Sequence, residues 1–319
     1  MSTAKAADRA LHSKRGQKCP RTELSTVGII MIEHWLDGVF EEAGLPVSGS
    51  PNRFVRRNVF KSLDSGECYV VEGVDLPASS RRIRQAEMLE DLFEAGNEKV
   101  VRWMRTREGH FGIYDHGLFW QCRKYVPCNE LPRDSYALEA WRGIEAARFL
   151  KGIMQYKCQE HPFYVTDYIH RLMHVLEKEH PALHGDLGDV LASLKLKRED
   201  EVVLPLVFSH GDFHPGNILW GDKCINAVID WEFCGPKPIC YDAANLLGCI
   251  GVDNPDWLSA PMASAFLNEL KLPPFAENML LKYIVALRFA WMREWWHLKD
   301  KDMIVQELDF MWIVISMLD

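Results

Sequence analysis

Short stretches rich in β-branched and aromatic residues fill the chain before Pro127, where they alternate with two helical patterns. The turn Asp64-Ser65-Gly66 separates the first two stretches, which is typical of a β-hairpin. Ser79 and Ser80 begin the second helical pattern and are expected to cap it. In order, the pattern predicts a helix over 27–43, strands over 54–60 and 68–71, a helix over 79–95, and strands over 112–114 and 118–125.

Longer helical patterns follow Pro127. Apolar residues recur every three or four positions, which predicts helices over 138–150, 164–178, 284–298 and 308–315. We therefore expect a bilobal chain of the α+β class, with a small mixed β/α lobe before a larger and mainly helical one. The predicted organisation is a flexible basic tail over 1–22, an N-terminal lobe over 23–125 and a C-terminal lobe over 126–319.

Composition narrows the class of protein. The 319 residues carry 37 Lys and Arg against 45 Asp and Glu, and the net charge of −8 argues against general binding to nucleic acids or anionic membranes. The longest aliphatic run, 29–32, is too short to span a bilayer. Nine scattered cysteines, no Cys-x-x-Cys pair and no recognisable signal peptide favour a cytoplasmic location. The first 22 residues hold six basic residues and one Asp, which is typical of a solvated tail rather than of a transit peptide.

The segment 204–232 departs from the helical pattern. A short apolar run leads into a polar loop with His210 and Asp212, and two predicted strands then form a hairpin. The hairpin brings Asn217, before its first strand, beside Asp230, after its second. Phosphoryl transfer needs a carboxylate that accepts the proton of the attacking hydroxyl, and it needs oxygen ligands for Mg²⁺. Asp212 is the candidate base, and Asn217 and Asp230 are the candidate metal ligands.

Spaced motifs in this region carry a resemblance to a known family. His210-Gly-Asp212-x-x-x-x-Asn217 is followed by Val228-Ile-Asp230-Trp-Glu232 and then by Asp242-Ala-Ala-Asn-Leu. The sequence resembles the aminoglycoside phosphotransferase and choline kinase group of small-molecule kinases, which have a protein-kinase-like fold. The resemblance implies that Asp212 is the catalytic base, that Asn217 and Asp230 hold Mg²⁺, and that His210 and Asp242 brace the loop.

The same resemblance implies the substrates and the remaining site residues. ATP or GTP would donate its γ-phosphate to a hydroxyl of a small acceptor, with the nucleotide held near a hinge at Cys122, Lys124 and Val126. A cationic acceptor, such as an amino sugar, an amino alcohol or a choline-like compound, is compatible with the acidic balance of the chain. Its candidate contacts are a carboxylate and two tryptophans four residues apart: Glu232, Trp291 and Trp295. Core packing also explains the spacing of the tryptophans, and Glu232 is also explained as an exposed charge.

One pair of positions departs from the family. Its members carry a lysine on the second strand of the small lobe, paired with a glutamate on the next helix, and here Glu72 and Gln85 take these positions. Three explanations are open: the alignment is shifted, a nearby cation replaces the lysine, or the protein binds a nucleotide without transferring phosphate. Arg57 is the candidate cation for the phosphates, because it lies opposite Glu72 if the hairpin turn has two residues. Arg56 and Lys61 are the alternatives, since either could reach inward.

Other assignments also stay open in the sequence. His210 and Asp242 are also explained without a catalytic role. His210 is then a hydrogen-bonded histidine of the loop, and Asp242 caps a helix. His210, Asp212 and His214 have the spacing of a metallohydrolase ligand set, although that interpretation leaves the two oxygen ligands of the hairpin without a role. The sequence favours a small-molecule kinase over a catalytically impaired pseudokinase and over a metal-dependent hydrolase.

Overall fold

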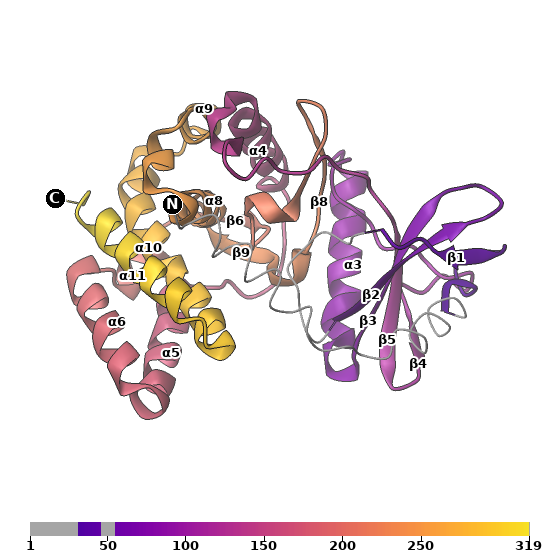
Figure 1. Cartoon of the computed structure of the whole chain (residues 1–319), viewed down its shortest axis with the longest axis horizontal. Helices are drawn as coiled ribbons and strands as arrows, with labels where there is room; N and C mark the ends of the chain where they lie inside the picture. Colours follow the sequence, from indigo (N-terminus) through magenta and orange to yellow (C-terminus); the bar gives the residue numbers. More distant parts are fainter. Residues whose placement is uncertain (1–30, 46–54, 319) are drawn as a thin grey trace. The chain divides into compact units, whose positions relative to one another are not determined.

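The computed structural model describes residues 31–45 and 55–318, and contacts divide them into two compact units (Figure 1). The smaller unit takes the described residues up to 130 together with the segment 216–232, and the larger unit takes 131–215 and 233–318. The predicted tail, and the first residues of the helix expected from residue 27, lie outside the described residues. Among the helices of the described part, none has the length and apolar character needed to cross a bilayer.

An antiparallel sheet of five strands forms the body of the smaller unit. Its strands lie in the order β1-β2-β3-β5-β4 and span Phe40–Glu42 (β1), Val55–Ser62 (β2), Cys68–Asp75 (β3), Ile113–Asp115 (β4) and Leu118–Lys124 (β5). The predicted hairpin is confirmed, including the register that places Arg57 opposite Glu72. The helix expected to reach residue 43 is wrong beyond residue 32, because a turn follows and Phe40 then enters β1, pairs with β2 and packs into the core of the sheet.

One helix and a second hairpin complete the smaller unit. Helix α3 (Ser79–Glu94) confirms the helix expected over 79–95. The expected serine cap is wrong, because a 3₁₀ turn at Leu76–Ala78 runs directly into α3 and Ala78 occupies the cap position. The hairpin of β7 (Ile218–Trp220) and β8 (Ile225–Val228) forms as predicted, with Ile218 opposite Val228.

Helices dominate the larger unit. They are α4 (Ala140–Ile153), α5 (Val165–Glu179), α6 (Pro181–Leu194), α7 (Arg198–Val202), α8 (Tyr241–Asp253), α9 (Pro261–Leu270), α10 (Pro274–Leu298) and α11 (Lys301–Ile315). The four helical patterns of the sequence correspond to α4, α5, α10 and α11 and are confirmed. The strands β6 (Leu206–Ser209) and β9 (Gly235–Pro238) pair antiparallel, which the sequence pattern did not predict. This pairing holds the chain on either side of the segment that carries the candidate chemistry.

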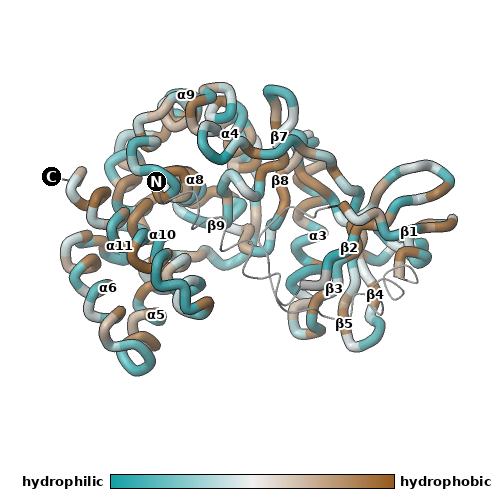
Figure 2. The backbone as a smooth tube through the Cα atoms, viewed as in Figure 1, coloured by the Kyte–Doolittle hydropathy of each residue, from teal (hydrophilic) through white to brown (hydrophobic). Residues whose placement is uncertain are grey.

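Apolar helices and one buried carboxylate organise the packing of the larger unit. Helix α8 is buried along almost its whole length, and the middle of α10 is apolar (Figure 2). Glu201, at the end of α7, is fully buried and accepts hydrogen bonds from the backbone nitrogens of Val165 (3.0 Å) and Thr166 (2.9 Å) and from the hydroxyl of Tyr283 (2.6 Å). The first N–H groups of a helix have no partner within it, so Glu201 caps α5 and joins it to α10.

Gly143 allows a close approach between α4 and α9. A Cβ atom at this position would lie 2.0 Å from the carbonyl oxygen of Met262 and 2.8 Å from the backbone nitrogen of Phe266. We expect Gly143→Ala to lower the free energy of unfolding by about 3 kcal/mol, because backbone atoms of α9 cannot move aside individually. Urea unfolding followed by circular dichroism measures the effect.

Gly185→Ala in α6 is the matched control, since its Cβ would meet nothing within 4 Å and alanine favours a helix. Equal stability of the two variants would contradict the close packing at Gly143.

Candidate active site

A buried carboxylate holds the start of the predicted catalytic loop. Asp242, in the first turn of α8, is 1% exposed and accepts hydrogen bonds from the backbone nitrogens of His210 (2.7 Å) and Gly211 (2.9 Å). Gly211 has a φ of +84°, and a Cβ there would lie 2.1 Å from the carbonyl oxygen of Phe233, so the position requires glycine. These contacts fix the backbone immediately before Asp212.

Two histidines contact Asp212 on this loop. His210 is fully buried, and its ring Nδ1 accepts a hydrogen bond from the backbone nitrogen of Asp212 at 3.2 Å. His214 Nε2 lies 3.6 Å from Asp212 Oδ2, and the side chain of Asp212 is 18% exposed. The ring of His210 is therefore engaged within the loop. Across the described ranges of the chain, no group of three His, Cys, Asp or Glu side chains is arranged to hold a metal ion.

The hairpin of the smaller unit brings Asn217 close to Asp230. The backbone nitrogen of Ile229 donates to the carbonyl oxygen of Asn217 at 3.0 Å, which joins the two ends of the hairpin. The side chain of Asn217 is fully buried and that of Asp230 is 8% exposed. Asp230 has a φ of +65°, in the left-handed region that aspartate adopts more readily than most residues.

The donor atoms of this hairpin fit a magnesium ion. Asn217 offers a carboxamide oxygen and Asp230 offers a carboxylate, which are the hard oxygen ligands that Mg²⁺ takes. Asp212 belongs to the larger unit, whereas Asn217 and Asp230 belong to the smaller one. The grouping of all three residues around one ion stays a prediction.

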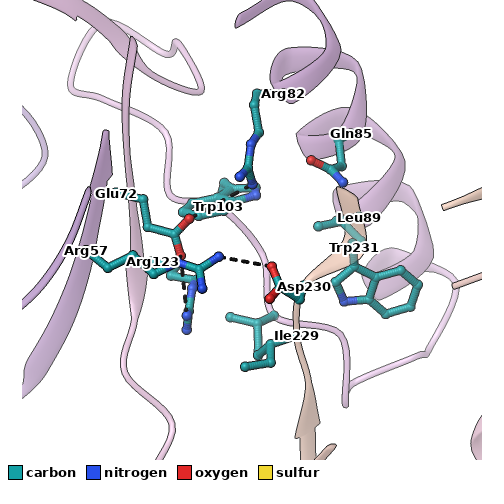
Figure 3. A pocket seen from close by; sticks show the side chains of 11 residues that line it. Arg57, Glu72, Arg82, Gln85, Leu89, Trp103, Arg123, Ile229, Asp230 and Trp231 are labelled. Atoms are coloured by element: carbon teal, nitrogen blue, oxygen red, sulfur yellow. Dashed lines mark hydrogen bonds and ion pairs between the residues drawn. The ribbon is translucent and has the colours of Figure 1, made fainter. Parts of the chain in front are cut away.

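Three arginines surround a buried carboxylate in the smaller unit (Figure 3). Glu72 on β3 is 3% exposed, and its Oε1 lies 3.0 Å from Arg57 Nε and 3.6 Å from Arg123 Nη2. Arg82 Nη1, from α3, lies 3.9 Å from Glu72 Oε2. We call these four residues the arginine cluster. Gln85 lines the same pocket, so the two positions that carry a lysine and a glutamate in the resembled family meet here as Glu72 and Gln85.

Opposite charges outweigh the cost of burial for Glu72 and Arg57, whereas burial lowers the pKa of Arg123. Burial opposes the charge of Glu72, but the three arginines together lower the pKa of its carboxyl below the ordinary value. Burial also opposes the charge of Arg57, whereas Glu72 and Asp230 raise its pKa. Arg57 Nη2 donates to Asp230 Oδ1 at 2.9 Å, and Arg82 Nη2 lies 3.7 Å from Glu232 Oε2. The candidate metal ligand Asp230 is thus ion-paired to the arginine cluster.

The residues expected at the hinge lie along β5 and just after it. Cys122 is fully buried in the sheet core, and burial raises the pKa of its thiol. Lys124 is exposed at the end of β5, where its Nζ lies 2.9 Å from Glu67 Oε1. Val126 is half-buried and packs against an apolar cluster that includes Ile229. Ile229 also lines the pocket of the arginine cluster, so apolar surface continues from the predicted hinge to the three arginines.

Trp291 and Trp295 stack on α10 in the larger unit, with ring centroids 5.9 Å apart. The rings of His214 and Trp291 lie nearly perpendicular, with centroids 5.6 Å apart, so the stacked pair borders the predicted catalytic loop. The indole N–H of Trp295 donates to Glu307 at 3.0 Å, and the Glu307 carboxylate also accepts two bonds of 2.7 Å from Arg288. Trp295 is hydrogen-bonded to the buried ion pair of Arg288 and Glu307, whereas half-buried Trp291 contacts His214 of the loop.

The sequence analysis did not identify Arg82 and Arg123. Arg123 lies next to Lys124 at the end of a mainly apolar strand, and Arg82 lies among several charged residues of α3. A signal was available in Glu72, because a carboxylate in the middle of an apolar strand is costly unless counter-charges reach it. That signal indicates that arginines are needed but does not say which ones supply the charge.

Comparison with known proteins now identifies the family. A model of the phosphotransferase enzyme family matches residues 58–277, which is more than two thirds of the chain and spans parts of both units. The chain belongs to this family. A comparison with curated proteins finds no match.

Solved structures share the fold of this phosphotransferase at low sequence identity. An aminoglycoside phosphotransferase from Alicyclobacillus acidocaldarius is 13% identical over 95% of this chain and 96% of its own, with a TM-score of 0.59. A spectinomycin phosphotransferase in complex with ADP and spectinomycin is 11% identical over 92% and 96%, with a TM-score of 0.61. A choline/ethanolamine kinase family protein from Mesorhizobium loti is 13% identical over 87% and 88%, with a TM-score of 0.56. The predicted α+β, protein-kinase-like fold is confirmed.

Removing the charge of Glu72 tests the arginine cluster. We expect Glu72→Gln to lower the free energy of unfolding by about 3 to 5 kcal/mol, because three largely buried guanidinium groups lose their shared counter-charge. Urea unfolding measures the loss.

Glu67→Gln, on the same hairpin, removes an exposed ion pair with Lys124 and is expected to leave stability unchanged within error. If the two variants were equally stable, the carboxylate of Glu72 would not be what holds the arginine cluster.

The pKa of Asp242 predicts how stability depends on pH. Burial raises this pKa from 3.8 to about 6, although bonds from the two backbone nitrogens and the charge of Lys237 oppose the rise. Between pH 3.8 and pH 6 the carboxyl of Asp242 is protonated in the folded protein and ionised in the unfolded chain. The stability that proton binding at Asp242 contributes is therefore complete below pH 3.8 and is lost as the pH rises through 6. The expected loss is about 3 kcal/mol.

Urea unfolding at several pH values measures this dependence in the native protein and in Asp242→Asn, which should lose this part of the slope between pH 4 and pH 6. Asp186→Asn, an exposed change in the same unit, should keep it. A slope that is unaltered in Asp242→Asn would show that another group titrates.

Proposed function

We propose that this phosphotransferase transfers the γ-phosphate of ATP or GTP to a hydroxyl group of a small molecule. The observation that carries the proposal is the anchored loop. Asp242 fixes the backbone at His210 and Gly211, and the following residue, Asp212, keeps part of its carboxylate exposed. A fixed but accessible carboxylate is what a general base for an alcohol requires.

Each candidate residue has a role that its chemistry supports. Asp212 would accept the proton of the attacking hydroxyl. Asn217 and Asp230 would hold Mg²⁺, which when bound neutralises charge on the phosphates. Arg57 would contribute positive charge toward the same phosphates in place of the missing lysine. The apolar surface at Val126 is suited to the flat face of a nucleotide base.

Trp291 is the best supported acceptor contact. It is half-buried, and the edge of His214 faces its ring, with His214 in turn 3.6 Å from Asp212. An aromatic face suits the apolar side of a sugar ring and attracts an ammonium group. We therefore propose acceptors with hydroxyl and amino groups: amino sugars, amino alcohols or choline-like compounds. Similar folds have been crystallised with spectinomycin and with hygromycin B, and one belongs to a choline/ethanolamine kinase family.

A second candidate function has one specific observation in its favour. The lysine position holds Glu72, and Arg57 is ion-paired with the candidate metal ligand Asp230. A pseudokinase that binds nucleotide without transferring phosphate would tolerate both features. Turnover of an acceptor separates this function from the kinase.

Asp212→Asn is the decisive variant for phosphate transfer. The assay incubates the full-length protein with ATP or GTP, Mg²⁺ and a panel of amino sugars and amino alcohols, and follows phosphorylated product by mass spectrometry. We expect the native protein to modify at least one acceptor and Asp212→Asn to lose about 10²- to 10⁴-fold in kcat, because a general base contributes that factor. The stabilisation by nucleotide and Mg²⁺ in thermal unfolding should be retained.

Asp186→Asn is the control, since it neutralises an exposed carboxylate in the same unit. Nucleotide binding without turnover of any acceptor would favour the pseudokinase. Full activity in Asp212→Asn would contradict the assignment of the base.

A further inference from the structure

Arg57 joins two carboxylates through two different nitrogens of its guanidinium group (Figure 3). Its Nε lies 3.0 Å from Glu72 Oε1, and its Nη2 donates to Asp230 Oδ1 at 2.9 Å. Because the two contacts use separate nitrogens, the hydrogen bond to Asp230 can break while the ion pair with Glu72 persists. The inference that follows rests on the proposed function, which assigns Asp230 to metal binding.

Among the described residues, the ion pairs around Arg57 join equal numbers of positive and negative side chains. Three guanidinium groups pair with three carboxylates: Arg57, Arg82 and Arg123 with Glu72, Asp230 and Glu232. A divalent cation at Asp230 would add positive charge beside Arg57, so the two cations would repel each other and compete for one carboxylate. A polyanionic phosphate arriving at the same place would restore the balance.

Arg57 is the arginine that such a cation meets first. It forms a direct bond to Asp230, whereas the ion-pair distances of Arg82 are 3.7 Å to Glu232 and 3.9 Å to Glu72, both longer than a hydrogen bond. Arg123 contacts Glu72. If the Asp230 carboxylate held a divalent cation, Arg57 would therefore be the arginine displaced from it, and the other two would keep their pairs.

We propose that Arg57 is an exchange residue, which neutralises Asp230 until a divalent cation replaces it and then turns its released Nη2 toward the phosphates of the nucleotide. Glu72 is the pivot, because its ion pair with Arg57, 3.0 Å from Oε1 to Nε, keeps the guanidinium in the pocket throughout. The exchange makes metal and nucleotide binding cooperative. Binding of the metal alone would require the ion pair between Arg57 and Asp230 to break. A nucleotide that binds together with the metal would gain an interaction with the released guanidinium of Arg57.

The affinity for Mn²⁺ in the absence of nucleotide tests the exchange directly. Mn²⁺ takes the same oxygen ligands as Mg²⁺, and the free ion is measured by electron paramagnetic resonance. We expect Arg57→Gln to bind Mn²⁺ about tenfold more tightly than the native protein, because a charge-assisted bond no longer competes for Asp230. Asp230→Asn should lose the binding in either background.

Nucleotide affinity provides the second readout. In the native protein, Mn²⁺ should strengthen the binding of a non-hydrolysable ATP analogue in isothermal titration calorimetry. In Arg57→Gln, the factor by which Mn²⁺ raises the affinity for the analogue should be about tenfold smaller, because the guanidinium that couples the two ligands is absent. The metal affinity and the coupling therefore change in opposite directions, which a general loss of structure does not produce.

Lys61→Gln is the matched control, since it removes an exposed positive charge from the same strand, β2. It should bind Mn²⁺ like the native protein. Arg57→Lys keeps a positive charge near Asp230, so its Mn²⁺ affinity should stay close to native even if Arg57→Gln unfolds.

The outcomes separate this inference from the proposed function. If Asp230→Asn abolishes Mn²⁺ binding but Arg57→Gln leaves it unchanged or weaker, the exchange is overturned and the metal role of Asp230 stands. If Asp230→Asn has no effect on Mn²⁺ binding even with nucleotide present, the assigned metal site fails and the exchange fails with it.

Discussion

The burial of one carboxylate constrains the smaller unit. Glu72 is 3% exposed, and a carboxylate at that depth is tolerated only with counter-charges close by. These come from three elements: Arg57 on β2, Arg82 on α3 and Arg123 on β5. Through Arg57 the same network reaches Asp230 at the end of the β7–β8 hairpin. The position of the candidate metal ligand thus depends on a charge in the middle of the sheet.

The arginine cluster joins β3 to α3 with an acid on the strand and a base on the helix. The alignment made from the sequence predicts the inverse in the resembled family, with a lysine on the strand and a glutamate on the helix. Here the acid is on the strand at Glu72 and the base on the helix at Arg82, while Gln85 at the glutamate position lines the same pocket. Because an ion pair holds two elements together with either polarity, the inversion leaves the fold intact. It changes which side chains can meet a phosphate, since arginine and lysine differ in reach and geometry.

The sequence predicted what short-range patterns determine and missed what depends on packing. The Asp-Ser-Gly turn set the register of β2 and β3, so Arg57 was predicted opposite Glu72, and the β7–β8 hairpin followed from the same reasoning. The β6–β9 pair joins segments separated by the whole loop and hairpin, and no local periodicity reports such a pairing. The strand at Phe40 was mistaken for helix because its burial comes from pairing with β2. Arg82 was missed because charge on an amphipathic helix usually faces solvent.

Two buried carboxylates support the candidate site by different physics. Asp242 is held by backbone N–H groups, which carry no net charge, and burial raises its pKa to about 6. Glu72 is held by guanidinium groups, which lower its pKa. The hydrogen bonds that anchor the predicted catalytic loop are short and buried, and the charges of Lys237 and Asp212 also act on the pKa of Asp242. The arginine cluster is an arrangement of balanced full charges, so any ion that binds Asp230 disturbs it.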